Sequence, residues 1–237
     1  MSDAATTRDY YERLYAEQGF GAQRRYPNEE LCRFMGRNFF AIPNAKRAGV
    51  RILEVGCGSG ANLWMIAREG FDTHGVDLSE ESIALARQML AQYGCKATLR
   101  VANMLELDDA PGGYDAVVDV FSSYCLNATE GHRFLQTVHE ILKPGGLFFS
   151  YFPSKSSDAY TNHKPATLVD EDTLSGIYRQ DSPFSGNHYP FRFLHPNEYE
   201  QMLVQSGFEV KYSETVSRTY GSGKEVFSFI TIEARKL

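Results

Sequence analysis

The stretch "ILEVGCGSGANL", residues 52–63, decides the fold class of this chain. Residues 50–55, "VRILEV", form a short apolar and β-branched run of the kind found in buried parallel strands. The run enters a turn with glycine at every second position, and residues 61–70 then have the apolar spacing of a helix. A strand, a glycine-rich turn and a helix in this order bring bare backbone close to a bound molecule.

Short apolar runs alternate with amphipathic segments in the residues that follow. Ile83, Ala86 and Met89 have helical spacing, and Ser79 is a suitable N-terminal cap for that helix. Strands that alternate with helices in this rhythm predict a parallel, doubly wound α/β sheet. Strands are expected at residues 72–79, 97–103, 114–121 and 147–152, and a further helix at 130–142.

The last third of the chain follows a different pattern. Residues 153–194 are polar and aromatic, with weak periodicity. A helix comes next, with Pro196 in its first turn and Gly207 at its end. The remaining residues have the pattern of a hairpin around residues 221–223. We therefore expect the sheet to end in an antiparallel strand near residues 226–234.

Composition narrows the range of partners. The chain has 237 residues, a net charge of −6 and no block of basic residues, which argues against a nucleic-acid partner or an acidic membrane surface. The N-terminal "MSDAATTRDYYERLY" has no apolar signal region, and the longest apolar runs fall far short of the ~20 residues of a membrane helix. Cys32, Cys57, Cys95 and Cys125 are scattered, which indicates reduced thiols, a cytoplasmic location and no zinc site.

The glycine-rich turn by itself fits more than one ligand. Gly56, Gly58 and Ala61 satisfy the G-x-G-x-x-A pattern of dinucleotide-binding proteins, and Asp77 follows at about the distance of a ribose-binding acid. Against a dinucleotide, Glu54 lies two residues before Gly56, where a strand end that faces a pyrophosphate would avoid a carboxylate. The chain also ends in a hairpin instead of further strand–helix units.

Four motifs resemble those of class I S-adenosylmethionine (SAM) methyltransferases, in order and at the usual spacing. The resemblance covers roughly residues 50–152. It implies a Rossmann-like, doubly wound seven-stranded sheet with an antiparallel last strand, an N-terminal helical segment and a lid insertion after the fifth strand. The motifs are "EVGCGSG" (54–60), "GVDLS" (75–79), "VANMLEL" (101–107) and "LKPGG" (142–146). A single methyltransferase domain is expected over 1–237, with a helical cap (1–45), a SAM-binding core (50–152), a lid (153–194) and a C-terminal helix and hairpin (195–237).

The resemblance also implies roles for individual residues. Asp77 would accept hydrogen bonds from both ribose hydroxyls, and Glu54 would lie near the methionine amino group. Asn103 would contact the adenine amino group, and Met104 would pack beside the ring. Two alternatives remain: Glu54 could pair with Arg51 or a backbone amide, and Asn103 could be an ordinary loop residue. The other expected cofactor-binding residues are Tyr11, Gly56, Cys57, Gly58, Gly60, Leu78, Val120 and Phe121.

Catalytic candidates must come from loops at the carboxyl ends of the strands, where doubly wound sheets bind ligands. Tyr124 follows the strand at 114–121 and should project there. His188, in the expected lid, is the preferred general base because histidine titrates near neutral pH. Tyrosines of residues 10–15 could close the pocket from the other side. Candidates for binding a carboxylate are Arg24, Arg25 and Arg192.

The residues after the strand at 114–121 also bear on the substrate. The sequence there, "VDVFSSYC", lacks the Asn/Asp-Pro-Pro-aromatic run, the Pro-Cys nucleophile and the Asp–Asn metal pair of other members of the family. We therefore expect transfer of a methyl group to N or O of a small-molecule metabolite, without a metal. Alternatives are a protein or tRNA methyltransferase, and a protein that uses SAM for alkyl transfer or intramolecular cyclisation, or only binds it. The oligomeric state is left open.

Overall fold

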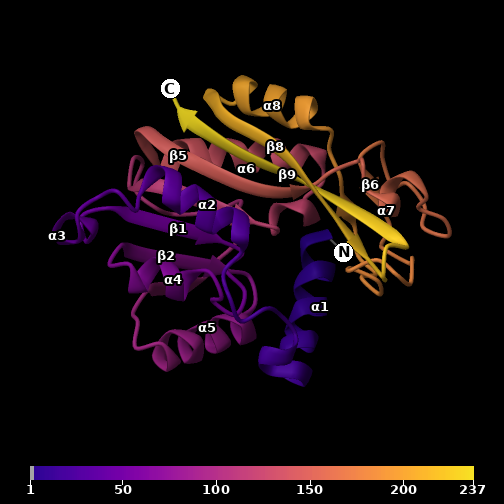
Figure 1. Ribbon diagram of the computed structural model, residues 1–237, viewed down its shortest axis with the longest axis horizontal. Helices are drawn as coiled ribbons and strands as arrows, with labels where there is room; N and C mark the ends of the chain where they lie inside the picture. Colours follow the sequence, from indigo (N-terminus) through magenta and orange to yellow (C-terminus); the bar gives the residue numbers. More distant parts are fainter. Residues whose placement is uncertain (1–2) are drawn as a thin grey trace.

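The protein is built on one seven-stranded sheet (Figure 1). Its strands are β1 (Arg51–Val55), β2 (Asp72–Asp77), β3 (Thr98–Val101), β4 (Tyr114–Val120), β5 (Leu142–Pro153), β8 (Phe208–Tyr220) and β9 (Glu225–Lys236). The computed structural model describes residues 3–237 and gives the strand order β3-β2-β1-β4-β5-β9-β8. Strands β1 to β5 are parallel, and β9 runs antiparallel between β5 and β8. The predicted doubly wound sheet with an antiparallel last strand is confirmed, although that strand lies one position inside the edge.

Helices cover both faces of this sheet. The longer ones are α2 (Glu29–Asn38), α5 (Glu80–Gln92), α6 (Ala128–Ile141) and α8 (Pro196–Gln205), and the shorter α4 (Leu63–Arg68) follows the glycine-rich turn. On β5, Phe149 stacks on Phe34 of α2 at 4.9 Å between ring centroids, whereas Phe148 contacts Phe134 of α6 at 6.0 Å. Because neighbouring residues of a strand point to opposite faces, α2 and α6 lie on opposite sides of the sheet.

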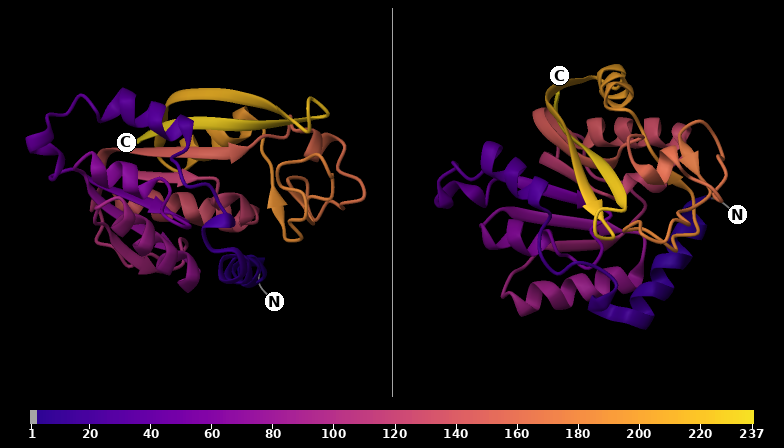
Figure 2. Two further views of the ribbon diagram at one scale, coloured as in Figure 1. Left: turned by 60° about the horizontal axis from the view of Figure 1, so that its bottom comes forward. Right: turned by 45° about the vertical axis from the view of Figure 1, so that its right-hand side comes forward.

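Two further segments lie at the carboxyl ends of the parallel strands. One is α1 (Asp3–Gln18), and the other is the insertion 153–194, with α7 (Asp158–Thr161) and the short strands β6 (Thr173–Leu174) and β7 (Phe191–Arg192). Both views in Figure 2 show α1 beside this insertion. Glu12 of α1 accepts hydrogen bonds from the Ser79 hydroxyl and from the first backbone N–H groups of α5. This carboxylate therefore holds α1 at the positive end of the α5 dipole.

The predicted boundaries differ from the observed ones mainly at β5. This strand begins at Leu142, earlier than the predicted 147, because Leu142 already pairs with Tyr114 of β4. The "LKPGG" motif therefore lies within an irregular stretch of the strand, where the register shifts between Tyr114 and Ala116. At the predicted hairpin, Tyr220 pairs with Glu225, as expected for a turn around residues 221–223.

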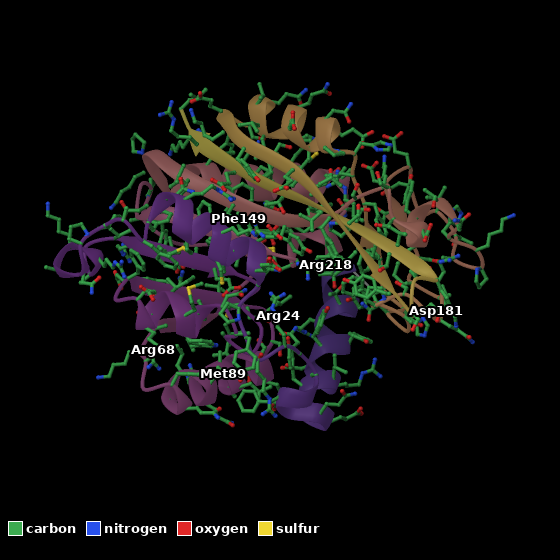
Figure 3. The ribbon with its side chains drawn as sticks, viewed as in Figure 1. Arg24, Arg68, Met89, Phe149, Asp181 and Arg218 are labelled. Atoms are coloured by element: carbon green, nitrogen blue, oxygen red, sulfur yellow. The ribbon has the colours of Figure 1, made fainter. Side chains whose placement is uncertain are left out.

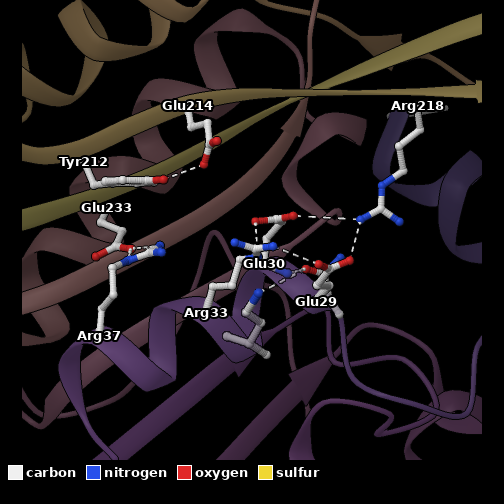
Figure 4. Close-up of polar contacts among 10 residues, drawn as sticks. Glu29, Glu30, Arg33, Arg37, Tyr212, Glu214, Arg218 and Glu233 are labelled. Atoms are coloured by element: carbon white, nitrogen blue, oxygen red, sulfur yellow. Dashed lines mark hydrogen bonds and ion pairs between the residues drawn. The ribbon is translucent and has the colours of Figure 1, made fainter.

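Ion pairs fasten α2 to the last two strands (Figure 4). The Arg37 guanidinium donates to the buried Glu233 of β9 at 2.8 Å and lies 4.2 Å from the ring centroid of Tyr212 on β8. Arg218 of β8 pairs with Glu29 at the start of α2, at 3.1 Å. These ion pairs therefore hold the start of α2 next to the glycine-rich turn. That turn forms part of the functional site described in the next section.

The insertion shares the main hydrophobic core. Phe191 and Phe193 are fully buried and pack with Phe227 of β9. Cutting out residues 153–194 would therefore remove both rings and expose the face of Phe227 against which they pack. Of the helices in residues 3–237, none has the length and apolar character needed to cross a bilayer.

Candidate functional site

Two adjoining pockets open at the carboxyl ends of the parallel strands, below α1 and the insertion. They share Tyr11, Gln23, Gly56 and Phe121 in their walls. Their empty volumes, which include space open to solvent, are about 770 and 1160 Å³. The β2-side pocket is further lined by Gly58, Asp77, Leu78, Asn103, Met104 and Tyr124. The lid-side pocket is further lined by Arg24, Glu54, Cys57, Val120, Phe184 and Asn187.

Asp77 organises the glycine-rich turn at the end of β2. One carboxylate oxygen accepts the Gly58 N–H at 2.8 Å, and the other accepts the Ser79 N–H at 3.0 Å. Burial raises the pKa of Asp77, which these two hydrogen bonds partly offset. Gly58 has φ +50°, and a Cβ there would lie 2.5 Å from Gln23 Oε1. The positive φ favours glycine at this position whatever ligand is bound, whereas the end of the flexible Gln23 side chain could move aside.

Glu54, on β1, presents an unsatisfied carboxylate oxygen to the lid-side pocket. Its side chain is buried, and Asn62 Nδ2 donates to Oε1 at 2.5 Å, while Oε2 has no hydrogen-bond partner among residues 3–237. Burial raises the pKa of Glu54 to about 8. Arg51 pairs with Asp72 at 3.1 Å, so the alternative in which Arg51 pairs with Glu54 is wrong. A buried oxygen without a partner is a place for a ligand donor, above all a cation.

The expected adenine-binding residues lie together in the β2-side pocket. Asn103 and Met104 follow β3, and Leu78 follows Asp77 at the end of β2. The Asn103 carbonyl accepts the Leu105 N–H at 3.0 Å, which closes a local turn. Its amide nitrogen makes no hydrogen bond within the part of the chain that the structure describes. The proposed contact with the adenine amino group stays a prediction. It would use the second lone pair of the Asn103 side-chain oxygen, because the NH₂ group can only donate and would suit a ring nitrogen.

Phe121 separates the two pockets in a strained backbone conformation. It has φ +60°, which is uncommon for a residue with a bulky side chain and is typical of functional sites. The fully buried Asp119 stabilises the turn by accepting the N–H groups of Ser122 and Ser123, each at 3.1 Å. The Phe121 ring then stacks on Phe184 of the insertion at 4.5 Å between centroids. The turn after β4 thus aims this ring at both pockets.

Three tyrosine hydroxyl groups meet where α1, the turn after β4 and the insertion come together. Tyr11 lies 2.8 Å from both Tyr124 and Tyr189, and Tyr124 and Tyr189 are 2.5 Å apart, measured between hydroxyl oxygens. Asn187 Nδ2 adds a hydrogen bond to Tyr189 at 3.0 Å. Burial raises the pKa of all three hydroxyls, that of Tyr11 to about 12. The tyrosine triangle is therefore neutral at physiological pH and fastens the insertion to α1.

The structure does not bring His188 to the site. Its side chain is exposed, lies 4.8 Å from the Tyr178 ring between centroids, and lines neither pocket. Asn187 and Tyr189 face the tyrosine triangle, and the residue between them points the other way, as in extended chain. Gly60 is also absent from both pockets, because its backbone packs against Ala86 of α5, 3.1 Å from where a Cβ would lie.

Of the three candidate arginines, only Arg24 lies at the site. It lines the lid-side pocket near Glu54 and makes no hydrogen bond or ion pair within residues 3–237 (Figure 3). Arg24 is exposed where it lines this pocket, and partial loss of solvent lowers the pKa of its guanidinium. Arg192 instead pairs with Asp172 at 3.3 Å inside the insertion. Arg25 is exposed, lies 5.7 Å from the Phe20 ring centroid and lines neither pocket.

Several lining residues carried no signal in the sequence. Gln23 and Asn62 occupy a turn and the start of a helix, where polar residues are common for many reasons. Asn62 nevertheless links Glu54 to α2, because its side-chain oxygen accepts the Asn28 N–H at 2.9 Å. Asn187 was likewise hidden in the aperiodic insertion. Only spatial contact, not spacing along the chain, identifies these three.

Comparisons with known proteins agree with this geometry. Residues 52–146 match the model of a family described as "Methyltransferase domain". A ubiquinone biosynthesis O-methyltransferase from Agrobacterium fabrum is 26% identical over 187 residues, which cover 78% of this chain and 69% of that protein.

Solved structures show the same fold along nearly the whole chain. One, described as "Conversion of a Disulfide Bond into a Thioacetal Group during Echinomycin Biosynthesis", has a TM-score of 0.69 at 17% identity and covers 97% of this chain and 92% of its own. Another is a Burkholderia thailandensis 1,6-didemethyltoxoflavin-N1-methyltransferase with bound 1,6-didemethyltoxoflavin and S-adenosylhomocysteine. Its TM-score is 0.66 at 16% identity, with 98% of this chain and 88% of that chain covered.

The sheet order, the glycine-rich turn and the acid at the end of β2 define a Rossmann-like methyltransferase fold. Residues 52–146 match the domain model of a methyltransferase family, and the comparisons support SAM as the cofactor. The residues present fit that cofactor, since the unsatisfied Glu54 oxygen and the unpaired Arg24 complement the two charges of an amino acid.

Proposed function

We propose that the protein transfers a methyl group from SAM to N or O of a small-molecule metabolite held in the lid-side pocket. The observation that carries the proposal is the junction of the two pockets. Gly56, Phe121 and Tyr11 belong to both walls, so a cofactor that reaches from the β2-side pocket into the lid-side pocket can meet an acceptor there. The names of two similar proteins support an acceptor of this size, because one acts in ubiquinone biosynthesis and the other methylates 1,6-didemethyltoxoflavin.

Each pocket would hold a different part of the cofactor. Asp77 would accept ribose hydroxyls, and Asn103 with Met104 would surround the adenine. At the inner end of the lid-side pocket, Glu54 would bind the amino group and Arg24 the carboxylate of the methionine arm. Cys57 and Val120 line this same pocket, which supports the cofactor contacts that the sequence predicts for them.

Orientation supplies most of the catalysis in this proposal. SAM provides a methyl group that the adjacent sulfonium charge already activates. The protein has to align the acceptor with that group, which contributes up to ~7–11 kcal/mol in ideal cases. Neither pocket is lined by a histidine or lysine, and the tyrosine hydroxyls are too weakly acidic to act as bases near neutral pH. We therefore assign Tyr124 a positioning role in the tyrosine triangle.

We also propose the division of the chain and its location. Residues 1–45 act as a cap, 50–152 as the SAM-binding core, 153–194 as a lid and 195–237 as the C-terminal helix and hairpin. The cap and the lid meet at the tyrosine triangle, which supports their joint role over the site. Four free cysteines support a cytoplasmic location, where thiols stay reduced.

Mass spectrometry of the products tests the proposal. The protein is incubated with methyl-deuterated SAM, with and without a metabolite extract. We expect S-adenosylhomocysteine together with a deuterium-labelled small molecule whose mass identifies the acceptor. Methylthioadenosine formed without any acceptor would contradict methyl transfer and would favour intramolecular displacement on SAM. Label found only in protein or RNA would contradict a small-molecule acceptor.

A further inference from the structure

The outer part of the lid-side pocket is lined by aromatic rings that remain partly open to it. We call these residues the aromatic slot: Tyr10 and Tyr11 of α1, Phe121 after β4, and Phe184 of the lid. All four are half-buried, whereas the rings packed behind them, such as Phe191, are fully buried. Part of the ring surface in the slot is therefore available to a ligand, because it is not buried in the hydrophobic core.

The rings of the slot are fixed in place before any ligand arrives. Phe184 lies nearly parallel to Phe121, with centroids 4.5 Å apart and 20° between the planes. On the other wall, Tyr10 meets Tyr11 edge to face at 5.3 Å, and the Tyr10 hydroxyl donates to Asn187 Oδ1 at 3.0 Å. Because both walls are held by contacts within the protein, a planar ligand would lose little freedom in ordering them.

Charge in this pocket is confined to its inner end. Glu54 and Arg24 are the charged side chains among the residues that line it, and both lie beside the glycine-rich turn, where the amino acid of SAM needs them. The slot itself offers only hydroxyl and amide groups, from Tyr10, Tyr11 and Asn187. An ionised acceptor would therefore lose its hydration without gaining a counter-ion from the side chains of the slot, which is costly.

We propose that the acceptor is a planar, uncharged aromatic or heteroaromatic ring that the aromatic slot holds against the face of Phe184. This inference rests on the proposed function. The slot supplies stacking surface, and the hydroxyl and amide groups at its edge supply directional hydrogen bonds. No side chain in the slot acts as a strong base, so the attacking atom must offer a lone pair as the bond between the methyl carbon and sulfur breaks and S-adenosylhomocysteine leaves. A pyridine-type nitrogen becomes a cation and releases no proton, whereas a phenol oxygen or an aryl N–H must release its proton to water. Two sources fit this description: a heteroaromatic or aryl nitrogen, and a phenol oxygen.

Ligand-observed NMR on protein saturated with S-adenosylhomocysteine tests the ring and the charge separately. The four probes are quinoline, catechol, 3,4-dihydroxybenzoate and cyclohexane-1,2-diol. We expect quinoline or catechol to bind at least about fivefold more tightly than the anion and the non-aromatic diol, consistent with typical gains from ring stacking. A preference for quinoline over catechol would indicate a nitrogen acceptor, and the reverse would indicate oxygen.

Variants of the slot locate the binding. Phe184→Leu keeps apolar volume but removes the ring, and it should weaken binding of the preferred probe at least about fivefold while S-adenosylhomocysteine affinity stays within about twofold. Tyr178→Ala is the matched control, because Tyr178 is an exposed lid aromatic that lines neither pocket. It should change neither affinity. Equal loss in both variants, or none in Phe184→Leu, would overturn the assignment.

The two proposals fail in distinguishable ways. If the metabolite experiment yields a methylated product that is aliphatic or charged, the aromatic slot is not the acceptor site, but methyl transfer stands. The same holds if the diol binds as well as catechol, or the anion binds better. If no extract component is methylated although S-adenosylhomocysteine binds, the proposed function itself fails, whatever the probes show.

Discussion

The two halves of the site are assembled in different ways. In the cofactor half, Glu54, Gly58 and Asp77 lie within one strand–helix–strand unit, and the contacts join neighbouring strand ends. In the acceptor half, Tyr11, Tyr124 and Tyr189 come from distant parts of the chain and meet through their hydroxyl groups. The cofactor half is assembled when the sheet forms. The acceptor half is assembled only when the cap and the lid pack correctly on each other. Mutations should therefore affect the two halves independently.

Asp77→Ala should have the largest effect, and it should be confined to the cofactor half. The change removes a buried acceptor for the Gly58 and Ser79 N–H groups and for the expected ribose hydroxyls. We expect SAM affinity measured by calorimetry to fall about 10- to 100-fold, from a loss of ~1.5–3 kcal/mol. Asp108→Ala is the control, since its side chain is 89% exposed. Equal affinities for wild type and Asp77→Ala would remove Asp77 from the cofactor site.

Glu54→Gln tests the cofactor half through its dependence on pH. In the unliganded protein the Glu54 pKa of about 8 lies above its ordinary value of 4.5, so the folded state binds more protons than the unfolded state between these values. Stability from this group is present at low pH and is lost as pH rises toward and through about 8. Glutamine does not ionise, so the variant should gain thermal stability over wild type as pH rises from about 5 to 9, by at least about 2–4 °C.

The same variant should weaken SAM binding about tenfold at high pH, because the ammonium group loses an ionised partner. At about pH 7, SAM binding to wild type should release a proton from Glu54, and binding to Glu54→Gln should release one fewer. Calorimetry in two buffers of different ionisation enthalpy measures the difference. Glu140→Gln, an exposed position on α6, is the control. Identical proton release in both proteins would show that Glu54 does not meet the amino group.

Tyr189→Phe should affect the acceptor half with a smaller magnitude. It leaves the hydroxyls of Tyr11 and Tyr124 paired with each other but removes the lid's hydroxyl from the triangle. We expect kcat/KM for the acceptor to fall about five- to tenfold, from ~1–1.5 kcal/mol, with SAM affinity within about twofold. Hydrogen exchange should quicken in residues 183–189. A loss of SAM affinity as large as that of kcat/KM would mean that the two halves are not independent.

His188→Ala should have the smallest effect. The side chain is exposed beside Tyr178 and lines neither pocket, so we expect kcat/KM to stay within about twofold of wild type and the pH profile to keep its shape. A loss of about tenfold or more, or a missing limb of the pH profile, would restore the histidine as a base and imply that the lid rearranges during turnover.

The same contrast explains what could be predicted from the sequence. Glu54, Gly56, Gly58 and Asp77 were expected as a group, because a strand–turn–helix unit fixes the distances between its own residues, and all four line the pockets. His188 lies outside both pockets because titration near neutral pH does not fix the direction of a side chain, and the next residue of an extended chain faces the opposite side. Gln23 was missed because the turn that it approaches at Gly58 is distant in sequence. Asn62 was missed because a polar residue at the start of a helix is common for many reasons. The start of β5 was missed because its first residue pair, Leu142 with Tyr114, is separated from the other pairs by a shift in register between Tyr114 and Ala116.

The position of β9 also sets the order in which parts of the molecule can become fixed in place as the chain is synthesised. This strand lies between β5 and β8, both of which precede it in the chain. It also anchors the lid, through hydrogen bonds from the Val226 N–H to Asp158 at 2.6 Å and from the Ser228 N–H to Ser157 at 3.0 Å. During synthesis, residues 153–194 therefore leave the ribosome before the strand that anchors them, so the lid is the part of the site whose anchor is made last.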